Sequence, residues 1–451
     1  MKLSKHKLGE LIEVTRGASL SGQFYAEEGE LIRLTLGNFN MNGGGFKENT
    51  SKTDLYYTGT VKDEFILNKG DIITPLTEQS LGLLGTTARI PENGKYIQSQ
   101  DVALVKCKEG LLDPNFCYYL ISSSIVRQQL SAGAQQTKIR HTSPDKIKDC
   151  TVWVPEFEEQ KRIGRILTDI DEKITLNRQI NDNLEAMAKQ LYDYWFVQFD
   201  FPNEEGKPYK SSGGAMAWNE KLKREIPQGL GAPKIGDIEK NIITGKTPSC
   251  ADEDNFGGDI PFVTIDDIRG NLFVFEAQRT LSTKGADSQE KKYLPIGSLS
   301  VSCIGTIGVM GFVARLAQTN QQINSIVFEH EYNKEYLYFS LRLYFENAKA
   351  KTGNVFANMS KEEFASIIVA YPPKQILQAF HNKVAPIFDS IKNNIEEINA
   401  LTKQRDELLP LLMNGQASVN YHLPARTDIP ILNLQNLHYT ANTIKISITF
   451  S

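Results

Sequence analysis

The sequence predicts an α+β protein in which one mixed α/β domain occurs twice. A long helix follows each copy, and the two helices pair as a coiled coil. Three observations predict this fold class: segments of the first half recur in the second, each copy alternates β-rich runs with turns, and each copy is followed by a seam of regularly spaced apolar residues. At 451 residues, with 40% hydrophobic and 23% charged residues, the chain can form several cores.

The repeat is visible in motifs that recur at a slowly changing offset. The segment KLGELIEVTRGAS at 7–19 is echoed by KIGDIEKNIITGKTPS at 234–249. The offset is 229 at the threonine pair below and falls to 217 at the proline pair, as expected for one copied fold whose loops have since changed length. The matching pairs are Thr35 with Thr264, Gly70 with Gly297, Gly85 with Gly311, Gly133 with Gly353, and Pro155 with Pro372.

Each mixed domain contains short β-rich runs separated by Gly, Asn and Pro turns, and one helical stretch near its end. This order is typical of an α+β domain with antiparallel or mixed strands. The predicted strands lie at 32–36, 71–76 and 101–107 in the first copy, and at 260–265, 298–304 and 323–329 in the second; the predicted helices span 114–130 and 334–350.

The long helices carry apolar residues at alternating steps of four and three, the spacing of a coiled-coil seam, and Asn at a seam position fixes register. A helix of about 35 residues is roughly 50 Å long, which exceeds the width of such a domain. We therefore expect the two seams to pair. Pro202 follows the first helix, and we expect Pro410 to end the second. The seams are Ile163, Leu167, Ile170, Ile174, Asn177, Asn181, Leu184, Ala188 and Leu191, and Phe380, Val384, Ile387, Ile391, Asn394, Ile398, Leu401, Arg405 and Leu408.

Composition excludes several classes of protein. No apolar run is long enough to span a membrane, and the N-terminus has no apolar signal region. Five scattered cysteines without a CxxC pair indicate reduced thiols and a cytoplasmic protein. The net charge of -4 and pI near 6.0 lack the usual basic footprint of a nucleic-acid binder, so DNA binding would need local patches or a second subunit.

No motif predicts an active site or a metal site. Gly245-Lys246-Thr247 resembles the end of a phosphate-binding loop, but Lys240 stands where that loop needs glycine. Asp145, Glu159 and Lys161 imitate a nuclease set, yet Glu159 opens the first long helix, where an acidic residue favours the helix dipole. The six histidines form no metal-binding pair.

The segment 154–201, VPEFEEQKRIGRILTDIDEKITLNRQINDNLEAMAKQLYDYWFVQFDF, with GKPYKSSGGAMAWNEKLKREIPQGL at 206–230, resembles the central conserved region of the specificity subunit of type I restriction-modification enzymes. The resemblance extends from residue 1 to about 417, although the second helix lacks the Glu159-Gln160 pair of the first. It implies antiparallel helices and pseudo-twofold symmetry. The implied parts are target-recognition domains at 1–155 and 233–372, conserved helices at 156–200 and 373–417, a linker at 201–232, and a tail of unknown role at 418–451.

The resemblance also implies a non-catalytic function. Each recognition domain would read one half of a bipartite double-stranded DNA target, and the helices would set the spacing between the halves. The helices would also dock two methyltransferase subunits, which carry S-adenosylmethionine. Separate restriction or motor subunits would use ATP and Mg, and this chain would bind no cofactor itself.

Base reading requires amide, hydroxyl, Arg or Lys side chains on loops. The alternative for each candidate is an ordinary exposed turn residue. The DNA-binding candidates are Thr77, Gln79, Ser80, Gln135, Gln136, Lys138 and Arg140 in the first repeat, and Cys303, Thr306, Lys351, Asn354 and Asn358 in the second.

The expected coiled-coil and subunit contacts are Ile163, Leu167, Ile170, Ile174, Leu184, Trp195, Phe380, Val384, Ile387, Ile391 and Leu401. The aromatic cluster around Trp195 is either local core or a docking patch for the methyltransferase. Two other functions remain open from sequence: a coiled-coil scaffold without a DNA role, favoured by the acidic pI, and a stand-alone metal-dependent nuclease.

Overall fold

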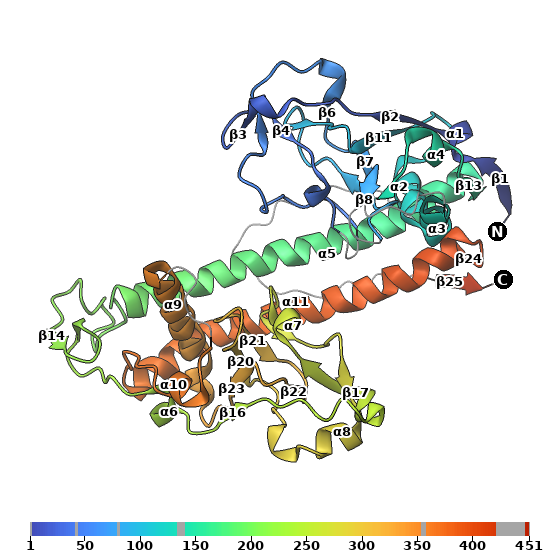
Figure 1. The fold of residues 1–451 in the computed structure, drawn as a ribbon. Helices are drawn as coiled ribbons and strands as arrows, with labels where there is room; N and C mark the ends of the chain where they lie inside the picture. Colours follow the sequence, from blue (N-terminus) through green and yellow to red (C-terminus); the bar gives the residue numbers. More distant parts are fainter. Residues whose placement is uncertain are drawn as a thin grey trace. The chain divides into compact units, whose positions relative to one another are not determined.

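The computed structural model describes residues 2–40, 44–78, 82–132, 140–352, 358–420 and 447–450 (Figure 1). The chain divides into two compact units: unit 1 comprises residues 1–174 and 400–451, and unit 2 comprises residues 175–399. The long helices α5 (Phe157–Tyr192) and α11 (Lys374–Met413) each contribute residues to both units. Each unit therefore contains one mixed domain and a part of each long helix.

Unit 1 contains a sheet of strand order β2-β11-β7-β9, in which every pair is antiparallel, and a second sheet of order β3-β5-β4-β10-β6, in which only β4 and β10 run parallel. Strand pairs β1–β13 and β8–β12 complete it. Its strands are β1 Leu3–Lys7, β2 Ile12–Arg16, β3 Tyr25–Ala26, β4 Ile32–Arg33, β5 Tyr56–Tyr57, β6 Ile66–Leu67, β7 Ile72–Pro75, β8 Thr77–Glu78, β9 Ala88–Arg89, β10 Tyr96–Ile97, β11 Val102–Cys107, β12 Arg140–His141 and β13 Thr151–Pro155, and its short helices are α1 Leu8–Leu11, α2 Pro114–Ser122, α3 Ser124–Ala132 and α4 Pro144–Lys148.

Unit 2 contains a sheet of order β16-β23-β20-β21-β18 and a three-stranded sheet of order β19-β17-β22. A hairpin, β14–β15, lies between α5 and the second mixed domain in the chain. The strands of unit 2 are β14 Met216–Asn219, β15 Arg224–Pro227, β16 Ile242–Thr244, β17 Phe256–Val263, β18 Phe273–Val274, β19 Thr280–Leu281, β20 Leu299–Ser302, β21 Met310–Val313, β22 Gln318–Thr319 and β23 Ile323–Ile326. The shorter helices of unit 2 are α6 Ile235–Ile238, α7 Ile265–Ile268, α8 Thr283–Asp287, α9 Lys334–Thr352 and α10 Lys361–Ala365.

The strand register confirms the predicted repeat. The order β2-β11-β7-β9 of unit 1 corresponds to β16-β23-β20-β21 of unit 2. Lys7 pairs with Thr151 in the first copy, and Lys234 pairs with Ile368 in the second. These partners differ by 227 and 217 residues, which are offsets of the sequence repeat. Two segments that lie far apart in the chain are thus paired in the same register in both copies.

One predicted glycine pair is wrong. Gly70 and Gly297 do correspond, because both have positive φ at equivalent turns. Gly85, with φ of 80°, corresponds to Gly308, with φ of 84°, and not to Gly311, which pairs within β21. The error arose because the letters Ala-Arg follow in both copies at an offset that the strand register does not share.

In unit 2, residues of the two helix seams contact each other. In unit 2 the Asn394 amide donates to Asn181 Oδ1 (2.8 Å), and the buried Asn177 amide donates to Glu397 Oε2 (2.6 Å). Residue 177 of α5 thus contacts residue 397 of α11, and residue 181 contacts residue 394. The residue numbers rise along one helix while they fall along the other, so the two helices are antiparallel. Of the predicted contacts, Ile163, Leu167, Ile170, Ile174, Phe380, Val384 and Ile391 are buried, and Leu184, Ile387 and Leu401 are half-buried.

Two predicted helix boundaries are wrong. Helix α11 continues through Pro410 to Met413. The interior of α11 also accommodates Pro386, so proline does not end this helix, and its last turn is closed by Asn414 N donating to the Pro410 carbonyl (3.0 Å). The predicted helix at 114–130 is two helices, because Ser123 has extended backbone angles between α2 and α3.

In the tail, strand β24 (Ala417–Asn420) pairs antiparallel with β25 (Ser447–Phe450). The tail, whose role the sequence did not predict, therefore contains a strand pair. Among the described helices, none combines the length and the apolar character needed to cross a membrane.

Candidate nucleic-acid interface

Four segments of unit 1 meet at one end of its sheets through backbone hydrogen bonds. Ala18 N donates to the Gln98 carbonyl (2.9 Å), Leu76 N to the Asp101 carbonyl (2.8 Å), and Thr142 N to the Leu76 carbonyl (2.8 Å). These bonds bring together turns that are widely separated in sequence. We name them turn cluster 1, comprising residues 17–21, 76–78, 98–101 and 140–142.

Unit 2 contains the same arrangement. Lys246 N donates to the Thr319 carbonyl (2.9 Å), Cys303 N to the Gln322 carbonyl (2.8 Å), and Met359 N to the Cys303 carbonyl (2.8 Å). The three bonds repeat those of unit 1 at equivalent positions. We name these segments turn cluster 2, comprising residues 245–249, 303–306, 319–322 and 358–359.

The loops selected from sequence belong to these clusters. In unit 1 the strand pair β8–β12 joins Thr77 to His141, and in unit 2 an isolated bridge joins Ile304 to Asn358. The two pairs are related by the repeat offsets of 227 and 217 residues. The sequence therefore identified two of the four segments of each cluster and missed the other two, 17–21 with 98–101 and 245–249 with 319–322.

The described candidates of unit 1 are structural. Thr77 is buried in β8. Arg140 is half-buried and forms an ion pair with Glu78 (3.2 Å), whose side chain is 1% exposed. Glu78 Oε2 accepts the backbone N–H groups of residues 82–84 at 3.0–3.1 Å. Arg140 thus braces a loop instead of extending outward. The candidates Gln79, Ser80, Gln135, Gln136 and Lys138 lie outside the described residues.

The candidates of unit 2 divide differently. Cys303 is 2% exposed, and burial raises the pKa of its thiol to about 11, so its proposed contact with a base is not possible in this structure. Thr306 and Asn358 are exposed on turn cluster 2. Lys351 belongs to α9, with its side chain outside the described part, and Asn354 lies outside the described residues.

Two glycines allow the missed turns to approach their partners. A Cβ atom on Gly17 would lie 2.3 Å from the Gln98 carbonyl oxygen, and one on Gly245 would lie 2.2 Å from the Asn320 carbonyl oxygen. No side chain fits at either position. The recurrence of glycine in the two opening motifs was the available signal, but the partner turns lie some eighty residues further along and have no periodic pattern.

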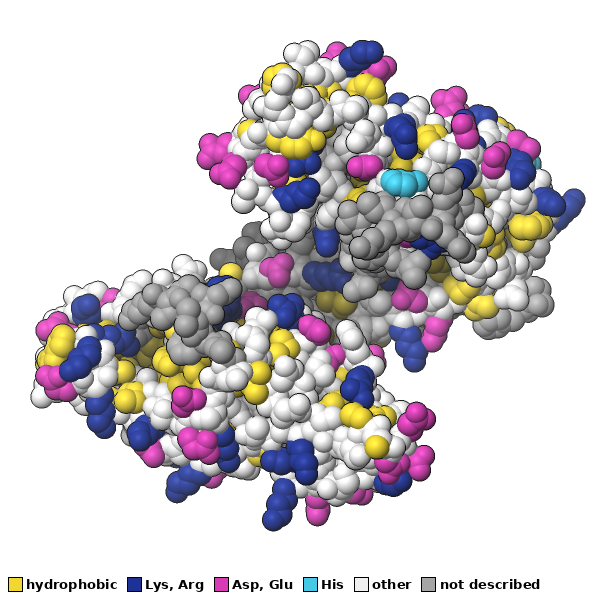
Figure 2. Space-filling view, viewed as in Figure 1, with side chains coloured by type: hydrophobic (Ala, Val, Ile, Leu, Met, Phe, Trp, Pro, Cys, Tyr) yellow, Lys and Arg dark blue, Asp and Glu magenta, His cyan; other side chains and the backbone are white. Residues whose placement is uncertain are grey.

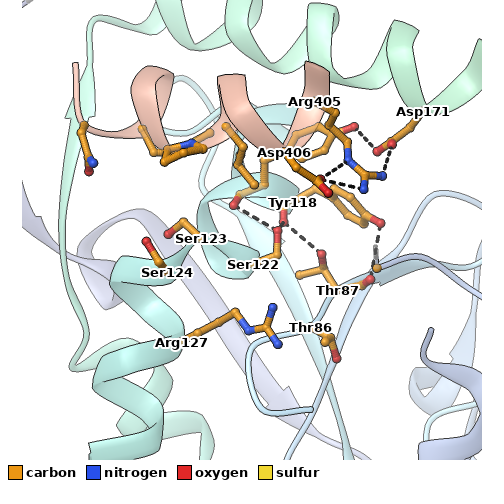
Figure 3. A pocket seen from close by; sticks show the side chains of 16 residues that line it. Thr86, Thr87, Tyr118, Ser122, Ser123, Ser124, Arg127, Asp171, Arg405 and Asp406 are labelled. Carbon is orange, nitrogen blue, oxygen red and sulfur yellow. Dashed lines mark hydrogen bonds and ion pairs between the residues drawn. The ribbon is translucent and has the colours of Figure 1, made fainter. Parts of the chain in front are cut away.

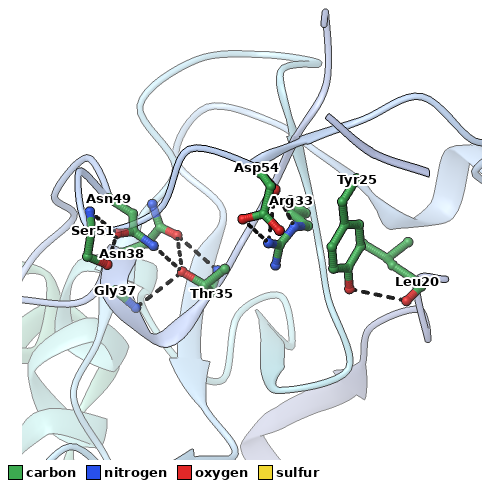
Figure 4. Close-up of polar contacts among 9 residues, drawn as sticks. All are labelled: Leu20, Tyr25, Arg33, Thr35, Gly37, Asn38, Asn49, Ser51 and Asp54. Atoms are coloured by element: carbon green, nitrogen blue, oxygen red, sulfur yellow. Dashed lines mark hydrogen bonds and ion pairs between the residues drawn. The ribbon is translucent and has the colours of Figure 1, made fainter. Parts of the chain in front are cut away.

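A polar cavity of about 340 Å³ opens beside turn cluster 1, and Figure 4 shows polar contacts among several residues that line it. The Arg33 guanidinium lies 3.8 Å from the centre of the Tyr25 ring and pairs with Asp54 (3.2 Å). Asn49 donates to the Thr35 hydroxyl (2.8 Å). The cavity walls thus offer amide, hydroxyl and guanidinium groups, which suit a hydrogen-bonding ligand such as the edge of a base.

A cluster of three side chains, the unit 1 anchor, joins the mixed domain of unit 1 to both long helices, and Figure 3 labels two of them, Asp171 and Arg405. Tyr119 of α2 donates to Asp171 Oδ2 of α5 (2.6 Å), and Arg405 of α11 donates to Asp171 Oδ1 (2.8 Å). Burial and the nearby Asp171 carboxylate raise the pKa of Tyr119, which keeps the phenol protonated as a donor. Together with Asp406, these groups line a cavity of about 370 Å³.

A similar cluster, the unit 2 anchor, is made of Tyr338, Arg342 and Glu185. Tyr338 of α9 donates to Glu185 Oε1 of α5 (3.3 Å), and Arg342 forms an ion pair with the same carboxylate. Burial raises the pKa of the Tyr338 phenol. Tyr338 follows Tyr119 by 219 residues, within the range of the repeat offsets. Both mixed domains are therefore fixed to α5 by a tyrosine, an acid and an arginine.

The charges do not assemble a nuclease site. Asp145 pairs with Lys148 (2.7 Å), and Glu159 pairs with Arg162 in the first turn of α5. No group of three His, Cys, Asp or Glu side chains within the described ranges could hold a metal ion. On the face drawn in Figure 2, Lys and Arg side chains are interspersed with Asp and Glu.

Trp195 does not form an exposed docking patch. It is 3% exposed, and its ring packs against Phe196 and Phe380, with centroids 6.0 and 5.8 Å away. The contact with Phe380 places it between the end of α5 and α11. The local-core interpretation of this aromatic cluster therefore fits the structure.

Comparison with known proteins agrees with this architecture. A family model described as the type I restriction modification DNA specificity domain matches residues 2–186 and 232–406. The Haemophilus influenzae type I restriction enzyme HindI specificity subunit is 30% identical, covering 72% of this chain and 84% of that protein. The Methanocaldococcus jannaschii type I restriction enzyme MjaIX specificity subunit is 24% identical, covering 69% and 71%.

Among solved structures, the type I restriction-modification system S subunit from M. genitalium has the same fold, with a TM-score of 0.58 and 16% identity over 92% of this chain and 96% of that chain. The family model matches both mixed domains and most of both long helices. The chain therefore belongs to the type I restriction-modification DNA specificity family.

Proposed function

We propose that this chain is the non-catalytic specificity subunit of a type I restriction-modification complex and that it reads a bipartite double-stranded DNA target. Each turn cluster contacts one half of the target. The observation that carries the proposal is the repetition of the cluster: three backbone hydrogen bonds are the same in both units, at 2.8–2.9 Å.

The side chains on this common backbone differ between the clusters. Ala18 of unit 1 corresponds to Lys246 of unit 2, and the segment following Thr77 differs in length from that following Ile304. A shared scaffold that presents different polar groups suits two domains that read different half-sites by direct readout. The continuous helices α5 and α11, which both units share, would set the distance between the half-sites.

The partners are two methyltransferase subunits and separate restriction or motor subunits in the cytoplasm. S-adenosylmethionine, ATP and Mg would be bound by those partners. Leu176 and Met187 support docking on α5: they are 50% and 58% exposed, and a step of eleven residues places them on one face of the helix. The net charge of -4 also favours sharing the phosphate contacts with basic partners.

A reconstitution experiment tests the function. The chain and its cognate methyltransferase subunit are purified together, incubated with S-adenosylmethionine and a random DNA library, and the methylated molecules are sequenced. We expect methylation of a sequence in two separated parts, and only when this chain is present. A scaffold without a DNA role would leave the methylated sequence the same with or without the chain.

A substitution separates docking from DNA reading. Met187→Asp should abolish co-purification with the methyltransferase while the chain stays folded. Leu316→Asp is the matched control, because Leu316 is also an exposed apolar residue of unit 2 (51%) but lies outside the long helices. Equal retention of the methyltransferase by Met187→Asp and by the wild type would exclude this docking surface.

A further inference from the structure

Gln321 lies at the tip of a turn in cluster 2, and it is one of the residues that sequence reasoning missed. Its side chain is exposed, and the Thr247 hydroxyl donates to Gln321 Oε1 (2.7 Å). We propose that Gln321 reads an adenine in the half-site of unit 2, with Thr247 as a positioning residue. The inference rests on the proposed function and names one specificity-determining contact within it.

The turn that carries Gln321 is braced on both sides. Gln322 N donates to Asn320 Oδ1 (3.1 Å), and the Asn320 amide donates to Gln322 Oε1 (3.0 Å). These two bonds between the flanking residues fix the backbone at the tip. Gln321 is thus presented from a turn whose conformation is set by its own sequence.

The neighbouring turn, residues 245–249, is held against the Gln321 turn by buried contacts. The buried Gln289 amide donates to the Lys246 carbonyl (2.7 Å) and to Gln318 Oε1. Gly245 permits backbone contact with Asn320, as described above. Thr247 therefore cannot move away from Gln321 without breaking buried contacts. A side chain already held in one orientation loses less conformational freedom on binding.

The amide of glutamine matches adenine in the major groove. It accepts from the N6 amino group and donates to N7, a bidentate pattern that other bases do not offer. Gln321 Oε1 has a second lone pair besides the one used by Thr247. Its Nε2 has no partner among the described residues, so both groups are available to the base.

Lys246 lies beside this contact and suits the phosphate backbone. Its side chain is exposed, and its ammonium has no partner in the part of the chain that the structure describes. A lysine at this place would add affinity without sequence preference. Substitution of Lys246 should therefore affect DNA affinity, whereas substitution of the adjacent Thr247 should affect sequence preference.

Unit 1 carries a glutamine at the equivalent position. Gln100 precedes Gln321 by 221 residues, is exposed, and lines the polar cavity of cluster 1. Ser19, two residues after Gly17, offers a hydroxyl where Thr247 follows Gly245. We expect Gln100 to read a base in the other half-site.

The test determines the methylated sequence, from a random DNA library, of the complex of full-length chain and methyltransferase. For Gln321→Ala we expect the preference for adenine at one position of one half-site to fall by roughly 10- to 100-fold, with the other half unchanged. Gln100→Ala should alter the other half only. Gln228→Ala is the matched control, because Gln228 is an exposed glutamine of unit 2 outside the long helices and the turn clusters, and it should leave the sequence unchanged.

Two further variants separate the roles. Thr247→Val removes the hydroxyl and keeps the shape, so it should weaken the same adenine preference less than Gln321→Ala does. Lys246→Met should weaken DNA binding equally for all sequences and reduce the slope of log Kd against log salt by about 0.9. Gln321→Arg should replace the adenine preference by guanine, the base that arginine pairs with in a bidentate manner.

An unchanged methylated sequence for Gln321→Ala, or a uniform loss of methylation without loss of preference, would overturn the inference. The melting temperature shows whether Gln321→Ala folds. If it does not fold, Gln321→Arg takes its place in the test, and an unaltered adenine preference in that variant would also overturn the inference. A wild-type complex without any sequence preference would instead contradict the proposed function, so the two failures are distinguishable.

Discussion

The hydroxyl of Tyr119 donates a hydrogen bond of 2.6 Å to Asp171, and this bond joins the mixed domain of unit 1 to helix α5. Tyr119 is buried, and Asp171 also receives Arg405 of α11 (2.8 Å). One carboxylate thus connects three elements of unit 1. In unit 2 the Glu185 carboxylate of α5 accepts from Tyr338 and pairs with Arg342, so each mixed domain is fixed to α5 through a carboxylate.

Tyr119→Phe should lower the free energy of unfolding by about 2 kcal/mol, because hydrogen bonds to charged groups contribute about 1.5–3 kcal/mol. The measurement is the melting temperature or a denaturant titration. Tyr118→Phe is the matched control: the Tyr118 hydroxyl lies 3.4 Å from the Thr87 carbonyl oxygen, beyond the usual bond length. An equal decrease in the free energy of unfolding for the two variants would show that the hydrogen bond to Asp171 does not stabilise the fold.

Arg405→Met should widen the range of half-site separations that are methylated, while each half-site sequence stays the same. Without Arg405, Asp171 loses its partner on α11, so the domain is held less firmly on the helix pair. The measurement is methylation of a library with fixed half-sites and variable spacers. Arg165→Met is the control, since Arg165 lies 3.8 Å from Asp169 on the surface of α5 alone. An unchanged spacer profile together with altered half-sites would contradict this role of the anchor.

Glu78→Gln should lower the free energy of unfolding by about 1–3 kcal/mol, because the buried Arg140 pair and a set of charge-assisted bonds are lost together. The substitution should also reduce the sequence preference at one half-site only, since Glu78 holds the loop of turn cluster 1. Glu92→Gln removes an exposed ion pair with Lys95 and should change stability by less than about 1 kcal/mol. If both half-sites change, Glu78 acts on the whole protein and not on its cluster.

The contribution of His381 to the free energy of unfolding should fall as pH rises. The hydrogen bond that His381 Nδ1 donates to the Glu335 carboxylate (2.6 Å) raises the pKa of His381 above 6.5, with Glu331 acting in the same direction and burial and Lys334 opposing it. A raised folded pKa adds stability that is fully present below pH 6.5 and is lost as pH rises through the folded value. The stability difference between wild type and His381→Gln should therefore be larger at pH 6 than at pH 9. A difference that grows with pH would exclude protonated His381 as its source.

The fold was largely predictable because repetition and periodicity leave marks in the sequence. The seam spacing identified the two helices and the asparagines that meet across them, and the recurring glycine motifs identified the duplicated domain. The glycine match failed at Gly85 because letters were compared where loop lengths differ. The proline rule failed at Pro410 because α11 continues through two prolines, Pro386 and Pro410, and packing of the helix rather than local propensity decides where it ends.

The candidate site was less predictable, since burial and long-range contacts decide it. Cys303 and Trp195 are compatible with a surface role by residue type but are buried by the packing of their units. The turns carrying Gln100 and Gln321 are short polar segments without periodicity. They are brought into the clusters by backbone bonds to the glycine turns about eighty residues earlier in the chain and to the segments that begin at Leu76 and Cys303.

Methylation of DNA carrying both half-sites at systematically varied separations tests the central claim most directly. The complex of this chain with its methyltransferase should methylate efficiently at one separation. It should lose activity when the spacer changes by one or two base pairs, and it should not methylate either half-site alone. Equal methylation at all separations, or full methylation of a single half-site, would contradict the claim that two copies of one domain read DNA together from a shared pair of helices.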